Sequence, residues 1–252
     1  MGVQRALRLG MIWPGGGAEH EYYQFAEALD DRIKIFLSCS RVGGEGDNDH
    51  DVDALLQTAR VDWLEEAARR LICLKPDVVF WACTSGSFIV GRAGAETQVS
   101  AIARTTGAPA GSTSLAFIAA LETLGTSRVS VLATYPEPAS RAFVKFLGEF
   151  GVEVLHMQWL DAASGWDAAL LDPEIVTEKA REAAIDGAEA LLVPDTAMPS
   201  LHLVERLERA TERPVLTANA VTLWQAMKLA GGAISVKGYG TLLAHRDVEN
   251  AA

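Results

Sequence analysis

Short apolar runs alternate with longer stretches of helical character along the chain. The apolar runs predict strands at residues 6–13, 32–38, 77–82, 128–133, 152–157, 189–193 and 214–217. The stretches between them predict helices at residues 19–29, 52–73, 85–105, 114–124, 138–150, 173–185, 201–210 and 220–230. Runs such as residues 190–193 are apolar throughout, which is typical of parallel strands covered by helices on both faces. The pattern therefore predicts an α/β fold built on parallel sheets.

An internal repeat indicates two similar halves. The corresponding segments are residues 8–14 and 128–134, residues 77–85 and 189–197, and the helix starts that follow Pro109 and Pro214. Chance similarity of generic strand–helix units is the alternative explanation. Duplication predicts an N-terminal half of residues 1–113 plus 220–252 and a C-terminal half of residues 114–219. Ligands of parallel sheets bind at the carboxyl ends of strands, so Cys83 and Asp195 are expected to face each other across a cleft.

Composition and charge restrict the class of partner. With 252 residues and 49% apolar content, the chain can bury one large core or two small ones. No apolar run approaches the roughly 20 residues of a membrane span, and the N-terminus lacks a secretory signal pattern, so we expect a cytoplasmic protein. A net charge of −11 argues against nucleic acid or an anionic membrane as a partner. A site for a carboxylate must therefore depend on local hydrogen-bond donors.

A cysteine at the end of a buried strand is the strongest chemical signal. The segment 81–87, Trp-Ala-Cys-Thr-Ser-Gly-Ser, leaves the predicted strand and enters a helix. At a helix N-terminus the unpaired N–H groups and the helix dipole favour the thiolate of Cys83. Thr84, Ser85 and Ser87 add donors for a carboxylate or enolate oxygen. The alternative is that Cys83 is a small core residue.

Asp195 occupies the matching position in the second half of the repeat. It could exchange a proton with Cys83 if the two side chains face each other. Its carboxylate could equally cap the next helix through backbone N–H groups.

Two strand-to-helix turns add possible ligands. Pro14, Gly15, Gly16 and Gly17 follow the first strand, where glycines allow backbone N–H groups to converge on an anion; a tight turn is the alternative. The corresponding turn, Thr-Tyr-Pro at residues 134–136, offers a hydroxyl group and a phenol.

Other polar and sulfur-containing segments carry weaker signals. The acidic segment 43–51 is interpreted as a solvated loop or a lid, because it lacks the Gly and the terminal Glu of a calcium loop. Three of the histidines have no metal-ligand spacing, and no metal site is predicted. Cys39 and Cys73 lie in apolar surroundings that suit core packing, and three cysteines without a CxxC pair predict reduced thiols.

Taken together, these residues resemble the aspartate/glutamate racemase superfamily, in the branch of maleate cis-trans isomerase and arylmalonate decarboxylase. The resemblance spans nearly the whole chain. It rests on Ala-Cys-Thr-Ser-Gly-Ser at 82–87, Thr-Tyr-Pro at 134–136, Met-Pro-Ser at 198–200 and Asn219-Ala near the C-terminus. It implies two flavodoxin-like halves related by a pseudo-twofold axis, an active site in the cleft between them, no metal or organic cofactor, a small carboxylate substrate and a homo-oligomer.

The sequence departs from the family pattern in two places. Members normally carry one cysteine in each half, but here the second place is held by Asp195. The family's decarboxylases also keep a single cysteine, although theirs lies in the second half. Maleate isomerases have an Asn where Gly17 stands here, which weakens the expectation of maleate itself as the substrate.

By resemblance, the functional residues divide into catalytic and substrate-binding groups. Cys83 is expected to be the nucleophile or proton carrier and Asp195 its partner base. Tyr135 and Asn219 are expected to bind a substrate carboxylate. The enolate-like oxygen is expected to be stabilised by Thr84, Ser85 and the backbone of Gly15 to Gly17, with Pro14 and Thr196 also in the substrate site.

The leading functional hypothesis is a cofactor-independent isomerase, in which Cys83 adds to or deprotonates the α-carbon of a small carboxylic acid. The first alternative is a decarboxylase or other lyase, which needs only one proton carrier. The second alternative is a binding protein for small carboxylates that has no catalytic activity.

Overall fold

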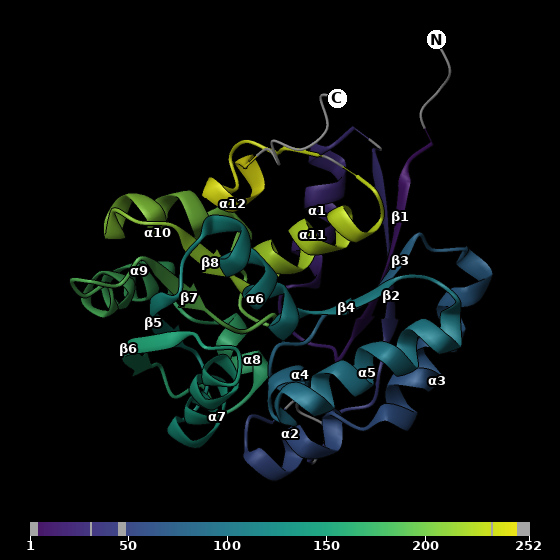
Figure 1. Cartoon of the computed structure of the whole chain (residues 1–252), viewed down its shortest axis with the longest axis horizontal. Coiled ribbons are helices and arrows are strands. Elements are labelled where there is room, and N and C mark those ends of the chain that lie inside the picture. Colours follow the sequence, from purple (N-terminus) through teal and green to yellow (C-terminus); the bar gives the residue numbers. More distant parts are fainter. Residues whose placement is uncertain (1–4, 31, 45–48, 233, 246–252) are drawn as a thin grey trace.

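The computed structural model describes residues 5–30, 32–44, 49–232 and 234–245. Its strands form two four-stranded parallel sheets (Figure 1). The first sheet has the order β2 (Ile33–Cys39), β1 (Leu7–Trp13), β3 (Val78–Trp81) and β4 (Ala110–Ser112). The second has the order β6 (Glu153–Trp159), β5 (Arg128–Ala133), β7 (Ala190–Val193) and β8 (Val215–Thr217). The two orders match position by position, which confirms the predicted fold of paired parallel-sheet halves.

Helices follow nearly every strand. They are α1 (Glu19–Ala28), α2 (Val52–Thr58), α3 (Val61–Leu71), α4 (Ser85–Phe88), α5 (Gly91–Thr106), α6 (Thr113–Leu124), α7 (Glu137–Gly148), α8 (Gly165–Ala169), α9 (Pro173–Ala183), α10 (Val204–Thr211), α11 (Ala218–Leu229) and α12 (Gly240–Ala244), with 3₁₀ turns η1 (Ile72–Leu74) and η2 (Leu201–Leu203). Within the described ranges, no helix is both long enough and apolar enough to cross a membrane.

Two predicted helices are divided in the structure. The predicted helix 52–73 breaks at Arg60, whose extended backbone separates α2 from α3. The predicted helix 85–105 is divided into α4, which ends at Phe88, and α5, which begins at Gly91. Gly91 has a φ of +67°. Three short elements were not predicted: the strand β4 and the helices α8 and α12.

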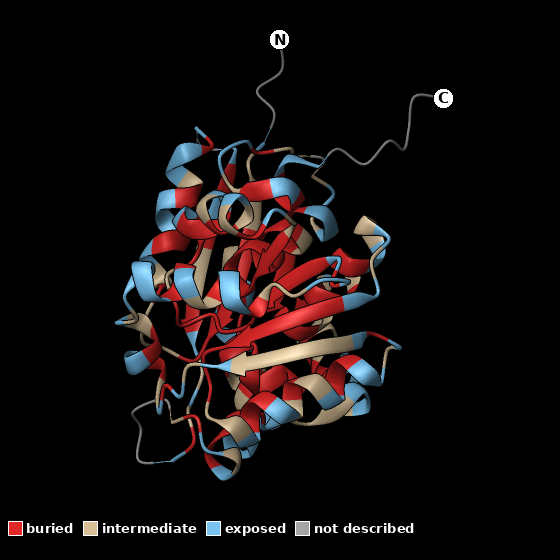
Figure 2. Ribbon diagram, turned by 90° about the vertical axis from the view of Figure 1, so that its left-hand side faces the viewer, coloured by how far each residue is buried: buried red, intermediate tan, exposed pale blue. Residues whose placement is uncertain are grey.

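The inner strands of the sheets are buried (Figure 2), and most of their buried residues are apolar. In the first sheet, Ile12 and Val79 pack with α3, whereas Met11 and Phe80 belong to a cluster that continues into the second half. This shared cluster includes α6 and α11, which pack against each other. The division of the chain at residues 113 and 219 stays a prediction.

The two cysteines expected in the core lie elsewhere. Cys39 and Cys73 are exposed, and only Cys83 is buried. Cys39 is the last residue of the edge strand β2, and Cys73 lies in η1 at the end of a helix. Both positions are at element ends, where an apolar neighbourhood in the sequence does not guarantee burial.

Candidate active site

A small cavity lies where the strand ends of the two sheets meet. Its volume of about 10 Å³ is roughly the space that one water molecule needs. Four connecting segments line the cavity. Three of them follow β1, β3 and β7, and the fourth, between β2 and α2, contributes His50. The lining residues are Trp13, Pro14, Gly15, Gly16, His50, Cys83, Ser85, Asp195, Thr196 and Ala197. The structure thus brings Cys83 and Asp195 together, each two residues beyond its strand.

Cys83 is held as a buried thiol. Its Sγ accepts a hydrogen bond from the backbone N–H of Gly86 at 3.3 Å and lies 3.7 Å from Oγ of Ser85. Burial raises the pKa of Cys83 to about 12; the contacts with Gly86 and Ser85 oppose this rise, and the charge of Asp195 adds to it. The prediction that the helix N-terminus favours the thiolate form of Cys83 was therefore wrong. The reason is that α4 has only four residues and desolvation outweighs its N–H groups.

Asp195 is fixed by two hydrogen bonds and an unusual backbone conformation. Its Oδ2 accepts from Oγ1 of Thr134 at 2.6 Å, and its Oδ1 accepts from the N–H of Ala197 at 2.8 Å. The φ of Asp195 is +133°, which a residue with a side chain rarely adopts and which carries strain. Burial raises the pKa of its carboxyl, while the charge of His50 and these hydrogen bonds lower it. The carboxylate stabilises its own turn and does not cap a following helix.

His50 was not singled out by the sequence. It is buried, and its Nε2 lies 3.9 Å from Oδ2 of Asp195. Its Nδ1 is 2.9 Å from the carbonyl oxygen of Ala162, and its ring meets the edge of Tyr135 with centroids 4.7 Å apart. The neighbouring Asp49 pairs with Ser164 in an antiparallel bridge, so a segment of the first half is joined to one of the second.

The glycine turn after β1 is shaped by a close backbone contact. Gly15, Gly16 and Gly17 all have positive φ values, of +99°, +71° and +115°. A Cβ atom on Gly17 would lie 2.3 Å from the carbonyl oxygen of Ala197. Pro14, Gly15 and Gly16 line the cavity, whereas Gly17 packs against the Asp195 loop. A side chain at position 17 would therefore collide with this loop unless the backbone moved.

Two buried hydroxyl groups beside the cavity make no hydrogen bond of acceptable geometry with any described residue. They are Oγ1 of Thr84 and the phenol of Tyr135. Neither residue lines the cavity itself, but Ser85 and Thr196 do. Burial raises the pKa of Tyr135 well above its ordinary value, and the charges of Asp195 and Cys83 raise it further. Both hydroxyl groups therefore remain protonated donors.

Asn219 lies behind the cavity wall. Its Nδ2 donates to Oε2 of Glu21 at 3.0 Å and approaches the carbonyl oxygen of Thr196 at 3.2 Å, while its Oδ1 accepts from the phenol of Tyr22. The amide is thus fully used within the protein. The side chain holds the loop that follows Asp195, and its expected role in binding a substrate carboxylate stays a prediction.

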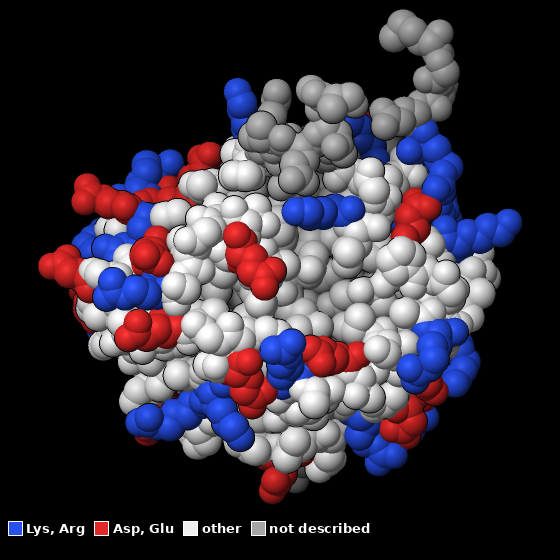
Figure 3. All heavy atoms as spheres, viewed as in Figure 1, with Lys and Arg blue, Asp and Glu red and all other residues white. Residues whose placement is uncertain are grey.

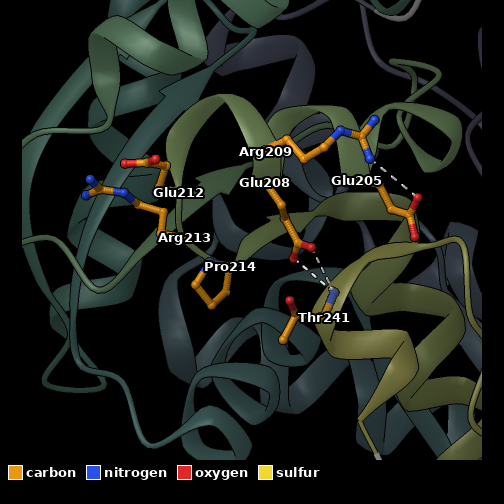
Figure 4. Close-up of a pocket in the computed structure, with 7 residues that line it drawn as sticks. All are labelled: Glu205, Glu208, Arg209, Glu212, Arg213, Pro214 and Thr241. Atoms are coloured by element: carbon orange, nitrogen blue, oxygen red, sulfur yellow. Dashed lines mark hydrogen bonds and ion pairs between the residues drawn. The ribbon is translucent and has the colours of Figure 1, made fainter.

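A second, more open hollow lies on α10, remote from Cys83. It has a volume of about 480 Å³ and is lined mainly by charged residues (Figure 4). There Glu208 accepts from the N–H of Thr241 at 2.9 Å and so caps α12. Basic and acidic side chains are interspersed on the face drawn in Figure 3. At the hollow, Arg209 pairs with Glu205 (Figure 4). This hollow contains no nucleophile, and we assign it a structural role.

The fold and the site define a class of enzyme. Two matching parallel sheets whose strand ends bring a buried cysteine to a shared cavity are the arrangement expected of the aspartate/glutamate racemase superfamily, and Asp195 is this chain's departure from it. A family model described as arylmalonate decarboxylase matches residues 52–243. The chain belongs to the arylmalonate decarboxylase family.

Named relatives fall into two activities. The chain is 30% identical to the arylmalonate decarboxylase of Bordetella bronchiseptica over 190 residues, covering 73% of this chain and 78% of the relative. It is 27% identical to the maleate isomerase of Alcaligenes faecalis over 129 residues, which is 51% of each chain.

A solved structure extends the likeness to the whole fold. It is a variant of the Nocardia farcinica maleate cis-trans isomerase with a covalently bound succinylcysteine intermediate. It has a TM-score of 0.84 and 22% identity, and it covers 95% of this chain and 98% of its own. The structural likeness shows a shared fold, and the named relatives include both an isomerase and a decarboxylase.

Proposed function

We propose that the protein interconverts the cis and trans forms of a small unsaturated dicarboxylic acid by transient addition of Cys83 to the double bond. The observation that carries the proposal is the cavity shared by Cys83 and Asp195, one from each half. The succinylcysteine intermediate of the Nocardia relative supports the same chemistry.

The proposed reaction begins with the thiol. Burial keeps Cys83 protonated in the empty cavity, so substrate binding must be coupled to removal of its proton. The thiolate then adds to one alkene carbon, forming a C–S bond while the π electrons move toward the adjacent carboxyl group. The former double bond becomes a single bond and can rotate. Expulsion of the thiolate restores the alkene in the other geometry.

Several donors are positioned to bind the developing negative charge. The hydroxyl groups of Thr84 and Tyr135 are buried near each other, make no hydrogen bond of good geometry with the described residues, and so can turn to a ligand; Ser85 lies beside Sγ of Cys83. A preorganised donor in a water-excluded site stabilises an oxyanion more strongly than water does, because it needs no reorientation. We assign these three hydroxyl groups to the carboxylate and the enolate-like oxygen of the substrate.

Decarboxylation of a small malonate is the second candidate. It is favoured by the presence of a single cysteine at the cavity and by the identity to the Bordetella decarboxylase. Loss of carbon dioxide would leave an enolate-like carbanion, which one proton carrier can quench. The same donors would serve both reactions.

Proton NMR of maleate, fumarate and methylmalonate incubated with the protein distinguishes these reactions. Cis–trans conversion that disappears in Cys83→Ala supports the isomerase. Loss of the malonate signal with release of carbon dioxide and no alkene conversion would replace it with the lyase. A non-catalytic carboxylate-binding protein predicts no turnover of any acid and ligand binding that survives Cys83→Ala, which calorimetry measures directly.

A further inference from the structure

The carboxyl group of Asp195 has one basic neighbour. Among the residues that the structure describes, His50 alone places a basic side chain within ion-pair distance of it, with Nε2 at 3.9 Å from Oδ2. Both side chains are almost fully excluded from solvent, at 2% and 4% exposure. The bare carboxylate would be costly in this setting, since a buried charge requires a partner.

The contact of Nδ1 with a carbonyl oxygen shows which ring nitrogen of His50 carries a hydrogen. Nδ1 lies 2.9 Å from the carbonyl oxygen of Ala162, and a carbonyl can only accept, so Nδ1 carries a hydrogen. Nε2 therefore presents either a lone pair or a proton to Asp195. Two facing lone pairs would repel, so the pair needs one proton; at 3.9 Å no hydrogen bond joins Nε2 to Oδ2, and that proton resides on one group or the other.

The position of His50 is enforced by contacts on several sides. Its backbone N–H donates to the carbonyl of Ala163 at 2.9 Å, and its ring packs at 76° against the ring of Tyr135. The titratable groups that face it are Asp195, Tyr135 and, across the cavity, Cys83. Of these, only His50 can carry a positive charge, so it alone can offset the negative charge of a thiolate, a carboxylate and an acidic substrate in one cavity.

We propose that His50 and Asp195 share one proton and act together as the proton carrier that faces Cys83. The inference rests on the proposed function and deepens it. The pair takes the place of the thiol that the second half of a two-thiol family member would supply. His50 is thus assigned a role that no motif in its own segment indicates.

The proton can be followed through one turnover. While the shared proton resides on Asp195, the Cys83 thiol gives its proton to Nε2 of His50, so the pair then holds an imidazolium and a neutral carboxyl group. The thiolate adds to one alkene carbon, and the pair returns the proton to the adjacent carbon, so the two π electrons end in one C–S and one C–H bond. After rotation, the pair removes a proton from that carbon and the thiolate leaves. No electrons are gained or lost overall.

The rate at which iodoacetamide alkylates Cys83 at pH 8 tests the shared proton without requiring turnover. Peptide mass spectrometry separates Cys83 from the exposed Cys39 and Cys73. In His50→Gln, the uncompensated charge of Asp195 should slow alkylation about tenfold, which corresponds to about one unit in the pKa of the thiol. Adding Asp195→Asn to that variant should restore most of the rate.

The matched control is His20→Gln, because His20 is exposed and belongs to α1. Its rate should equal that of the wild type. Thermal unfolding of each variant shows whether it is folded. If His50→Gln does not fold, Asp195→Asn alone decides: removing the charge of Asp195, which raises the pKa of the thiol, should speed alkylation of Cys83.

The outcomes separate this inference from the proposed function. An unchanged alkylation rate in His50→Gln, no rescue by Asp195→Asn, or no acceleration in Asp195→Asn alone overturns the shared proton, whichever acid is turned over. If the variants are alkylated at the expected rates but the wild type converts no acid, the proposed function is wrong, whereas the shared proton of His50 and Asp195 is supported. If both hold, His50→Gln should lower kcat with little change in KM, because His50 acts on proton transfer.

Discussion

Thr134 donates a hydrogen bond of 2.6 Å to Oδ2 of Asp195, and both side chains are buried. The bond joins the strand ends of β5 and β7, the two central strands of the second sheet. It keeps the carboxyl group aimed at the cavity and lowers its pKa against the burial that raises it. The charge state of Asp195 therefore depends on a hydroxyl group from a neighbouring strand.

Replacing Thr134 by Val should move the acidic limb of activity to higher pH. Without the donor, burial raises the pKa of Asp195 further, so the carboxylate is lost earlier as the pH falls. Loss of the buried partner should also lower the free energy of unfolding by about 1–3 kcal/mol. A pH profile of kcat/KM and urea unfolding measure the two effects. Thr97→Val, on the exposed side of α5, should change neither; an unmoved limb in Thr134→Val would contradict the argument.

Gly17 should tolerate a side chain much less well than Gly15. Both have positive φ, so either change to Ala strains the backbone by about 1–3 kcal/mol. Only at Gly17 would the new Cβ also meet the Ala197 carbonyl, at 2.3 Å, whereas nothing lies within 4 Å of the corresponding atom at Gly15. Urea unfolding should show Gly17→Ala to be less stable than Gly15→Ala by at least about 2 kcal/mol. Equal losses would mean that the turn moves away from Ala197 freely.

Cys83 and Asp195 could be located from the sequence because their positions depend on local patterns. Each follows an apolar strand by two residues, and the repeat relates the two strands. His50 could not be located in this way. Its ring nitrogen contacts a carbonyl 112 positions away, and the acidic segment around it gives only a loop signal. The contact depends on how the two halves dock, which no periodicity records.

The missed strand β4 and the internal contacts of Asn219 escaped the sequence for other reasons. Ala110–Ser112 is three residues long and contains a glycine, so its strand propensity is low and only pairing with β3 makes it a strand. The resemblance placed Asn219 in the substrate site because it begins a helix at a strand end. Its amide is instead consumed by Glu21 and the loop carbonyls, which the sequence does not reveal.

Glu21 should be indispensable to the loop that carries Asp195. Its buried carboxylate accepts from the N–H groups of Ser200 and Leu201 and from Nδ2 of Asn219. In Glu21→Gln, an NH₂ group would face at least one of these donors, and we expect a loss of about 2–3 kcal/mol in the free energy of unfolding. Glu27→Gln, exposed on the same helix, is the control in urea unfolding. A loss confined to a few tenths of a kcal/mol would show that the loop is held by other contacts.

The buried thiol predicts a specific loss of stability at high pH. The pKa of Cys83 is about 12 in the folded protein against an ordinary value of 9.0, so the unfolded chain releases this proton first as the pH rises. Its contribution to the free energy of unfolding is therefore complete below pH 9 and is lost progressively between pH 9 and 12. By pH 10.5 the wild type should have lost about 2 kcal/mol more than Cys83→Ser, measured by urea unfolding from pH 8 upward. Cys39→Ser, which removes an exposed thiol, should follow the wild type. If the free energy of unfolding depends on pH equally in the wild type and Cys83→Ser, the thiol has the same pKa in the folded and unfolded states. Removal of its proton would then require no base in the cavity.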